Sequence, residues 1–144
     1  MPLFAATLAT HVLIEAPPAH VWAILANLPE WASWNPFITA MAGDLRRGAR
    51  LAARMEPRGR KPMTMRPVVL EVRPGASLVW RGRLPVPGLF EGTHSFSLTA
   101  VPGGTRLDHA EAFRGLLVPF APPEGFRADF DAMNAALKAR AEAA

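Results

Sequence analysis

Hydrophobic and polar positions alternate most clearly between residues 90 and 113, and this pattern predicts a β-hairpin. The first strand is predicted to place five residues on one face: Phe90, Gly92, His94, Phe96 and Leu98. The second strand is predicted to direct to the same face Leu107, His109, Glu111 and Phe113. Imidazole and carboxylate groups are costly to bury unless they are paired, so a face that mixes them with phenylalanine favours a cavity wall over a packed core.

The turn of this hairpin predicts which side chains lie opposite each other. The sequence Pro-Gly-Gly at residues 102–104 marks its centre. A loop with an even number of residues keeps the apolar side chains of both strands on one face, whereas an odd loop would send half of them to solvent. The even loop places His94 opposite Glu111 and Phe96 opposite His109. An imidazole and a carboxylate are therefore predicted to be direct cross-strand neighbours.

The first part of the chain predicts a strand followed by short helices. Residues 7–15 alternate as a strand, and the prolines that follow it begin a short helix that ends at Pro29. A tryptophan-rich bend over residues 30–37 is predicted to add another helical turn. Trp31 is predicted to hold the short helices against the sheet, whereas Trp34 has two open interpretations, this structural role and stacking on a ligand.

Glycine and proline turns divide the middle of the chain into strands, predicted at about residues 38–42, 49–56, 63–73 and 77–84. Trp80 alternates with Leu78 and is predicted to face inward. Pro67 removes a backbone donor from the third of these strands, which indicates an edge or a bulge. The sequence therefore does not determine the face on which Met63 and Met65 lie.

The segment from residue 122 to residue 144 is predicted to be one long helix. Its apolar side chains recur at helical spacing, and its charged residues fall mostly on other faces. The stripe consists of Phe126, Phe130, Met133 and Leu137. A sheet with one apolar face can bury this stripe, which predicts an α+β fold in which a curved antiparallel sheet of about seven strands wraps around the helix.

Composition narrows the class of protein. The chain has 144 residues, half of them hydrophobic, and is expected to form a single domain over residues 1–144. The absence of cysteine excludes disulfides, thiol nucleophiles and thiolate metal sites, and is compatible with a reducing cytoplasm. His11 and Glu15 interrupt the N-terminal apolar segment, so no signal peptide or membrane insertion is expected. We expect a soluble, cytoplasmic protein.

The net charge of +4 raises the question of nucleic-acid binding, because half of the 16 basic residues fall between Arg46 and Arg66. Nucleic-acid surfaces usually combine basic side chains with aromatic rings on which bases stack. The basic residues of this segment are interleaved instead with glycine, alanine and proline. Solvated hairpin ends are the favoured interpretation, and no nucleic-acid partner is expected.

The order of predicted elements and three segments resemble the START-like SRPBCC superfamily, which includes polyketide cyclase/dehydrase and lipid-transport proteins. The segments are VWAILANLPEWASWNPF, LEVRPGASLVWRG and GGTRLDHAEAFRGLL. The resemblance covers nearly the whole chain and implies the helix-grip (START/Bet v 1-like) fold, with two short helices after the first strand. It also implies a deep apolar cavity between the sheet and the C-terminal helix. No cofactor is expected, and the protein is expected to be a monomer or a homodimer.

The cluster of His94, His109 and Glu111 has three interpretations. The side chains can satisfy each other and bound water inside a cavity. They can also work as an acid–base group, because a histidine held by a carboxylate has a fixed tautomer, as a proton-shuttling cyclase requires. Two histidines and a carboxylate on adjacent strands also have the composition of a metal-binding facial triad, but no further ligand is apparent, and no metal site is assigned.

These patterns predict a protein that binds a hydrophobic small molecule, with lipid-, polyketide- and aromatic-like ligands as the classes that the resemblance implies. The first alternative is a cyclase- or dehydratase-type enzyme, a lyase or isomerase, that uses His94 or His109 as its acid–base group. The second is a protein-binding role of the co-chaperone kind. The residues predicted to contact the ligand are Trp34, Phe37, Trp80, Phe90, His94, Phe96, His109, Glu111, Phe113, Phe126, Phe130 and Met133.

Overall fold

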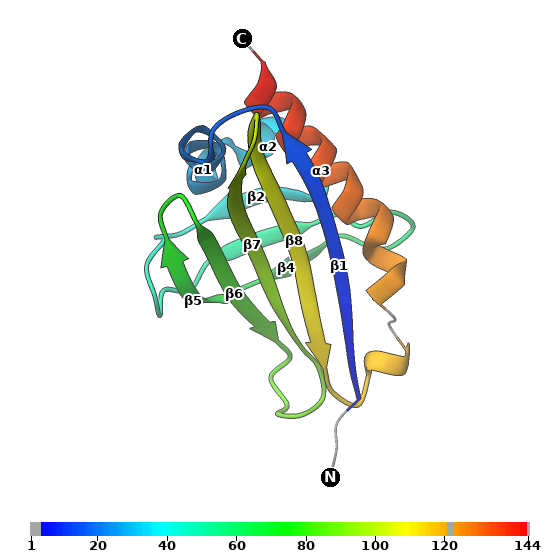
Figure 1. The fold of residues 1–144 in the computed structure, drawn as a ribbon. Helices are drawn as coiled ribbons and strands as arrows, with labels where there is room; N and C mark the ends of the chain where they lie inside the picture. The colour runs from blue at the N-terminus through cyan, green and yellow to red at the C-terminus, as the bar shows by residue number, and fades with distance from the viewer. Residues whose placement is uncertain (1–3, 121–122, 144) are drawn as a thin grey trace.

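The computed structural model describes residues 4–120 and 123–143 and has two antiparallel sheets and a long C-terminal helix (Figure 1). The large sheet has the strand order β1-β8-β7-β6-β5. Its strands are β1 (Ala5–Ile14), β5 (Val68–Arg73), β6 (Ser77–Arg83), β7 (Glu91–Val101) and β8 (Gly104–Arg114). The small sheet, in the order β2-β3-β4, consists of β2 (Ile38–Ala42), β3 (Ala52–Met55) and β4 (Met63–Met65).

Short helices close one end of the large sheet, and the long helix α3 crosses its concave face beside β1 (Figure 1). The short elements between β1 and β2 are α1 (Pro18–Ala26), the 3-10 helix η1 (Leu28–Glu30) and α2 (Trp31–Trp34). After β8 come η2 (Val118–Phe120), η3 (Pro123–Phe126) and α3 (Arg127–Glu142). This arrangement confirms the predicted α+β helix-grip fold. The predicted C-terminal helix starts later than expected, because residues 123–126 form a 3-10 turn; residues 122 and 144 lie outside the described residues.

The register predicted for the hairpin is confirmed. Strands β7 and β8 pair His94 with Glu111 and Phe96 with His109. A two-residue loop joins the strands, and its second residue, Gly103, has φ +86°. This left-handed conformation is available to glycine without a steric penalty, and a proline followed by a glycine of positive φ is typical of a type II turn.

The strand predicted over residues 63–73 is in fact two strands in two sheets. It breaks between Met65 and Val68, where Pro67 has no N–H for a ladder. The two sheets meet there, since the N–H of Leu51 donates to the Pro67 carbonyl over 2.8 Å and the N–H of Val69 donates to the Ala49 carbonyl over 2.8 Å. Residues 4–120 and 123–143 therefore contain eight strands, where the sequence predicted about seven.

The core lies between α3, the short helices and the middle of the large sheet. The α3 side chains Phe130, Met133 and Leu137 are each 1% exposed, as the apolar stripe predicted. Asp129 is the exception to the predicted charged faces. It is buried because its carboxylate accepts a hydrogen bond of 3.1 Å from the backbone N–H of Arg58.

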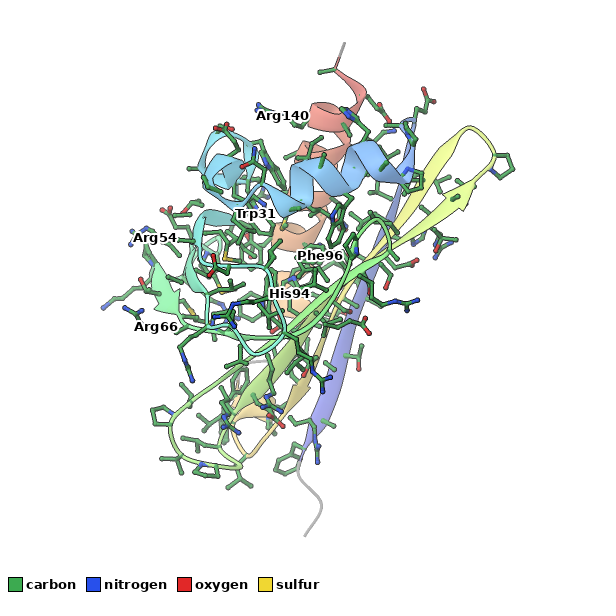
Figure 2. All side chains as sticks on the ribbon, turned by 90° about the vertical axis from the view of Figure 1, so that its left-hand side faces the viewer. Trp31, Arg54, Arg66, His94, Phe96 and Arg140 are labelled. Atoms are coloured by element: carbon green, nitrogen blue, oxygen red, sulfur yellow. The ribbon has the colours of Figure 1, made fainter. Side chains whose placement is uncertain are left out.

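Two further findings concern the basic segment and the length of the helices. The basic side chains between Arg46 and Arg66 are all exposed, and Figure 2 shows Arg54 and Arg66 pointing outward from the small sheet, as expected for solvated hairpin ends. Across residues 4–120 and 123–143, no helix combines the length and apolar character needed to cross a bilayer.

Candidate ligand-binding pocket

An apolar pocket of about 310 Å³ lies between the start of β7, the end of β8, the small sheet and the segment that leads into α3. Its walls are mostly aromatic and methionine side chains, with one carboxylate among them. The lining residues are Phe37, Met55, Arg60, Met63, Thr64, Met65, Leu84, Phe90, Gly92, Glu111, Phe113 and Phe126. A largely apolar cavity with few polar groups is the usual form of a small-molecule site.

A larger hollow of about 620 Å³ lies on the outer surface beside Arg46, Arg47 and Glu71. It is open to solvent, and its lining has no buried titratable group. Because binding sites for hydrophobic molecules bury most of the ligand, we place the candidate site in the apolar pocket.

Gly92 makes room for the carboxylate of the pocket. A Cβ atom at this position would collide with Oε2 of Glu111, so a larger residue would displace the carboxylate from its place. The neighbouring strand has Gly82 directly opposite Gly92, and a Cβ there would lie 2.7 Å from Cε of Met65. The two glycines thus shape different parts of the wall, one beside Glu111 and the other beside Met65.

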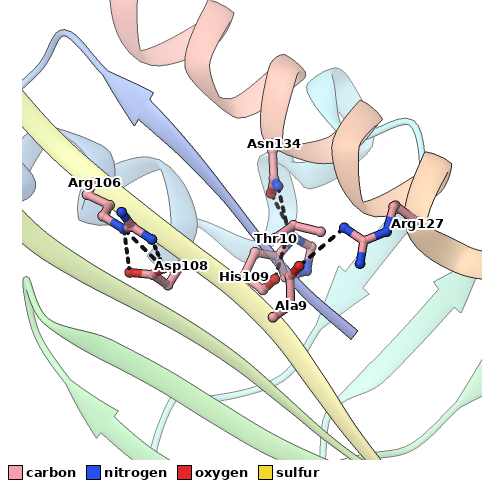
Figure 3. A network of polar contacts seen from close by, with 7 residues as sticks. All are labelled: Ala9, Thr10, Arg106, Asp108, His109, Arg127 and Asn134. Carbon is pink, nitrogen blue, oxygen red and sulfur yellow. Dashed lines mark hydrogen bonds and ion pairs between the residues drawn. The ribbon is translucent and has the colours of Figure 1, made fainter. Parts of the chain in front are cut away.

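A chain of polar contacts runs from Glu111 into the core (Figure 3 shows its inner end). Oε1 of Glu111 lies 3.4 Å from Nδ1 of His94, and Nε2 of His94 lies 2.6 Å from Nε2 of His109. Nδ1 of His109 lies 2.7 Å from Oδ1 of Asn134, whose Nδ2 donates to Oγ1 of Thr10 over 2.8 Å. Thr10 in turn donates to the backbone carbonyl of His109 over 2.7 Å. Each side chain of the chain is therefore held by the next.

His109 is the most deeply buried member of this chain. Its ring stacks between Phe96, with centroids 4.6 Å apart, and Phe130, with centroids 4.2 Å apart. Burial holds the pKa of His109 well below its ordinary value, and the neighbouring His94 lowers the pKa further, whereas the hydrogen bond to Asn134 raises it. His109 is consequently neutral at physiological pH.

Glu111 is the member of the chain that reaches the pocket. Its side chain is 14% exposed, against 3% for His94. The ring of His94 lies against Trp80, with centroids 4.9 Å apart, and both line only a narrow recess of about 20 Å³ next to the pocket. A ligand in the pocket therefore meets the carboxylate first, with the two histidines behind it.

The geometry argues against the facial-triad interpretation. The two Nε2 atoms of His94 and His109 face each other at 2.6 Å, which leaves no space for an ion between the rings. Among the residues that the structure describes, no three side chains of histidine, aspartate or glutamate are placed to hold a metal ion together. Hydrogen bonds join His94, His109 and Asn134 in series, and Glu111 lies beside this series at Nδ1 of His94.

The structure separates the residues predicted to contact a ligand, apart from Trp34, into three groups. Those that line the pocket are Phe37, Phe90, Glu111, Phe113 and Phe126. Those that line the adjoining recess are Trp80 and His94. Those packed in the core, away from the pocket, are Phe96, His109, Phe130 and Met133.

The tryptophans of the bend pack against each other. Trp31 is fully buried, and its Nε1 donates to the Leu25 carbonyl over 3.0 Å, so its predicted structural role is confirmed. The ring of Trp34 lies 5.6 Å from the Trp31 ring, away from the pocket. Figure 2 shows Trp31, Phe96 and His94 together in the interior between the sheet and the helices.

Sequence reasoning missed several residues of the pocket and of the polar chain behind it. The pocket also contains Arg60, whose guanidinium carbon lies 4.4 Å from the Phe126 ring centroid, and it contains Met63 and Met65, whose orientation the sequence did not determine. Asn134 was missed although a signal was present. It follows Phe130 by four residues, so it is a polar residue within the apolar stripe of the helix.

The chain matches the family model "Polyketide cyclase / dehydrase and lipid transport" over residues 5–142. Protein CV1439 from Chromobacterium violaceum is similar in structure, with a TM-score of 0.73, 18% identity, and coverage of 96% of this chain and 98% of that chain. The Zhui aromatase/cyclase from Streptomyces sp. R1128 has a TM-score of 0.73 and 16% identity, with 96% and 94% coverage.

A plant protein, the major latex-like protein 151 of Panax ginseng, has a TM-score of 0.80 at 9% identity, covering 96% of this chain and 99% of its own. At these identities the solved structures show a shared fold. No curated protein sequence matches the chain. The family match over nearly the whole chain identifies this protein as a member of the polyketide cyclase/dehydrase and lipid transport family, within the START-like SRPBCC superfamily predicted from the sequence.

Proposed function

We propose that this protein binds a hydrophobic small molecule in the apolar pocket and that Glu111 provides its polar anchor. The observation that carries this proposal is the lining itself, which is aromatic and aliphatic except for Glu111, Thr64 and Arg60. Burying an apolar ligand against such walls is favourable in proportion to the area removed from water. Membership of a family described by cyclase and lipid-transport activities supports the same conclusion.

The size of the pocket limits the ligand. A volume of about 310 Å³ is at the small end of the range typical of ligand sites, so we propose a compact molecule of about one to three rings or a short acyl chain. Three methionines, Met55, Met63 and Met65, form one wall. Their flexible and polarisable side chains can adapt to ligands of different shapes.

A cyclase-type reaction is the second candidate. The observation that favours it is the contact of Glu111 with both the pocket and His94, because a carboxyl group next to an imidazole can exchange a proton with a bound molecule. One similar structure is named an aromatase/cyclase. On this alternative the reaction would be of the lyase or isomerase class, and replacing Glu111 would abolish turnover while the apolar walls kept much of the affinity.

Native mass spectrometry of freshly purified protein, followed by calorimetric titration with naphthalene-sized probes, tests the binding proposal. We expect saturable binding to the folded wild type and weaker binding to Gly92→Leu, whose side chain fills the pocket beside Glu111. Ser97→Leu is the matched control, because Ser97 is exposed on the same strand. The proposal is wrong if the folded wild type carries no small molecule and binds none of the probes.

Other predictions from the sequence accompany this proposal. We propose that residues 1–144 act as one domain. Three statements about the protein stay predictions: that its ligands include lipids, that it is cytoplasmic, and that it is a monomer or a homodimer.

A further inference from the structure

The polar chain behind Glu111 has defined hydrogen-bond directions, and they can be read from its inner end. The hydroxyl of Thr10 has one hydrogen, which goes to the backbone carbonyl of His109, because a carbonyl cannot donate. The second partner of Oγ1 must therefore donate to it. Only the amide nitrogen of Asn134 can do so, and this sets the orientation of the Asn134 amide.

The orientation of Asn134 sets the tautomer of His109. With Nδ2 directed at Thr10, Oδ1 of Asn134 faces Nδ1 of His109 at 2.7 Å. An amide oxygen only accepts, so Nδ1 of His109 carries a hydrogen. Because His109 is fully buried and neutral, its Nε2 has a lone pair, and Nε2 of His94 must donate to it across 2.6 Å.

The tautomer of His94 in turn determines what Glu111 offers to the pocket. With the Nε2 hydrogen of His94 committed to His109, the remaining nitrogen, Nδ1, faces Oε1 of Glu111 at 3.4 Å. That contact uses Oε1, so Oε2, the oxygen beside Gly92, is the carboxylate oxygen that remains for a ligand, and a carboxylate oxygen accepts hydrogen bonds.

From this geometry, and resting on the proposed binding function, we propose that the pocket selects ligands with a hydrogen-bond donor, such as a hydroxyl or phenol group, over ligands of the same shape without one. Oε2 of Glu111 accepts this hydrogen bond, and Asn134 and His109 are positioning residues that keep His94 as the partner of Oε1. A ligand carboxylate would bring a second acceptor against Oε2, which repels it.

Two probes of similar size test this selectivity by isothermal titration calorimetry: 2-naphthol, which can donate a hydrogen bond, and 2-methoxynaphthalene, which cannot. We expect the wild type to bind 2-naphthol about tenfold more tightly than 2-methoxynaphthalene, as one hydrogen bond to a charged or strongly polar acceptor provides. Equal binding of the two probes would overturn the inference and leave the binding function intact. Absence of binding by both probes, with no co-purified molecule, would overturn both.

Two variants of Glu111 give the test a matched control. Glu111→Met keeps the volume but has no acceptor, so the preference for 2-naphthol should disappear. In Glu111→Gln the amide nitrogen can donate to Nδ1 of His94, which leaves the amide oxygen free for the ligand. This variant should keep most of the preference. A preference that survives in Glu111→Met, or is lost equally in both variants, contradicts the assignment of Oε2.

The role of Asn134 has a spectroscopic readout. Long-range proton–nitrogen NMR spectra of the wild type should show His109 with its hydrogen on Nδ1 and His94 with a hydrogen on Nε2. In Asn134→Leu we expect His109 to lose its single tautomer and the preference for 2-naphthol to fall several-fold, with the affinity for 2-methoxynaphthalene unchanged. The opposite tautomer of His109 in the wild type, or an equal fall in both affinities, would overturn the positioning role.

Discussion

The two ends of the interior, which lie along the same strands β7 and β8, differ in how they are filled. At the end covered by the short helices, Phe96, His109 and Phe130 stack face to face. Trp31 packs edge-on against the ring of Phe96. At the other end, Gly92, Glu111 and the methionines leave an open pocket. The same hairpin face thus forms a close-packed core in one half and a cavity wall in the other.

The comparison shows that the element packed against a strand, and not the residues of the strand alone, decides whether the face of the strand forms close-packed core or cavity wall. The core half of the hairpin lies under α3 itself, where the ring centroids of Phe130 and His109 are 4.2 Å apart. The pocket half lies under the 3-10 turn before α3, where the ring of Phe126 lies farther from its aromatic neighbours, with centroids 6.3 Å from Phe113 and 6.5 Å from Phe37. A helix that starts at Arg127 therefore packs one half and leaves the other open.

The largest expected effect separates the two phenylalanines of this helix region. Phe130→Ala should lower the free energy of unfolding by about 3 to 5 kcal/mol, because it removes a fully buried ring from the stack. Phe126→Ala should cost only about 1 to 2 kcal/mol, since this ring is half-buried and already borders empty space. Urea unfolding of both variants measures the difference. Equal losses would mean that the two halves are packed alike.

The buried polar chain should give the next largest effect. His109→Leu and Asn134→Leu should each cost about 2 kcal/mol, because each leaves a buried polar partner unsatisfied. The double variant should cost clearly less than the sum of the two, since it removes both members of that hydrogen bond. A double-mutant cycle by chemical denaturation checks this. Strict additivity would show that the bond contributes nothing to stability.

The burial of His109 predicts a pH dependence of stability. Its pKa is lowered in the folded state, so the unfolded chain binds a proton below about pH 6.5 that the folded protein does not. Stability is therefore complete above about pH 6.5 and falls as the pH decreases toward the folded-state pKa, by at most about 1.4 kcal/mol per pH unit.

Urea unfolding at pH 7.5, 6.5 and 5.5 measures this slope in the wild type and in His109→Leu. The variant keeps the exposed histidines His11 and His20, so their contribution is the same in both proteins. A slope between pH 6.5 and 5.5 that is as steep in the variant as in the wild type would contradict the neutral, buried state of His109.

The smallest expected effect on stability concerns the paired glycines of the pocket wall. Gly92→Ala should cost less than about 1 kcal/mol, because the displaced Glu111 side chain can turn into the pocket. The hydroxyl preference of the pocket should nevertheless disappear. Gly82→Ala is the matched control, since it displaces only Met65 and should keep the preference. Calorimetry with 2-naphthol and 2-methoxynaphthalene compares them, and identical behaviour of the two variants would contradict the placement of Oε2.

The sequence by itself determined the hairpin and its register. A period of two side chains and a two-residue turn are local properties, and a shift by one residue would reverse both faces, so His94 had to lie opposite Glu111. The long helix and its buried stripe followed in the same way from the helical spacing of Phe130, Met133 and Leu137. The fold class needed only these elements and their order.

Only the tertiary structure decided which apolar side chains border a cavity. Core and pocket wall use the same residue types, so Phe96 and Phe113 look alike in sequence, and the distance to the opposing helix separates them. The break at Pro67, which turns Met63 and Met65 toward the pocket, depends on pairing with residues 49–51 far along the chain. The contact of Asn134 with His109 joins positions 25 residues apart, and no local pattern specifies such a meeting.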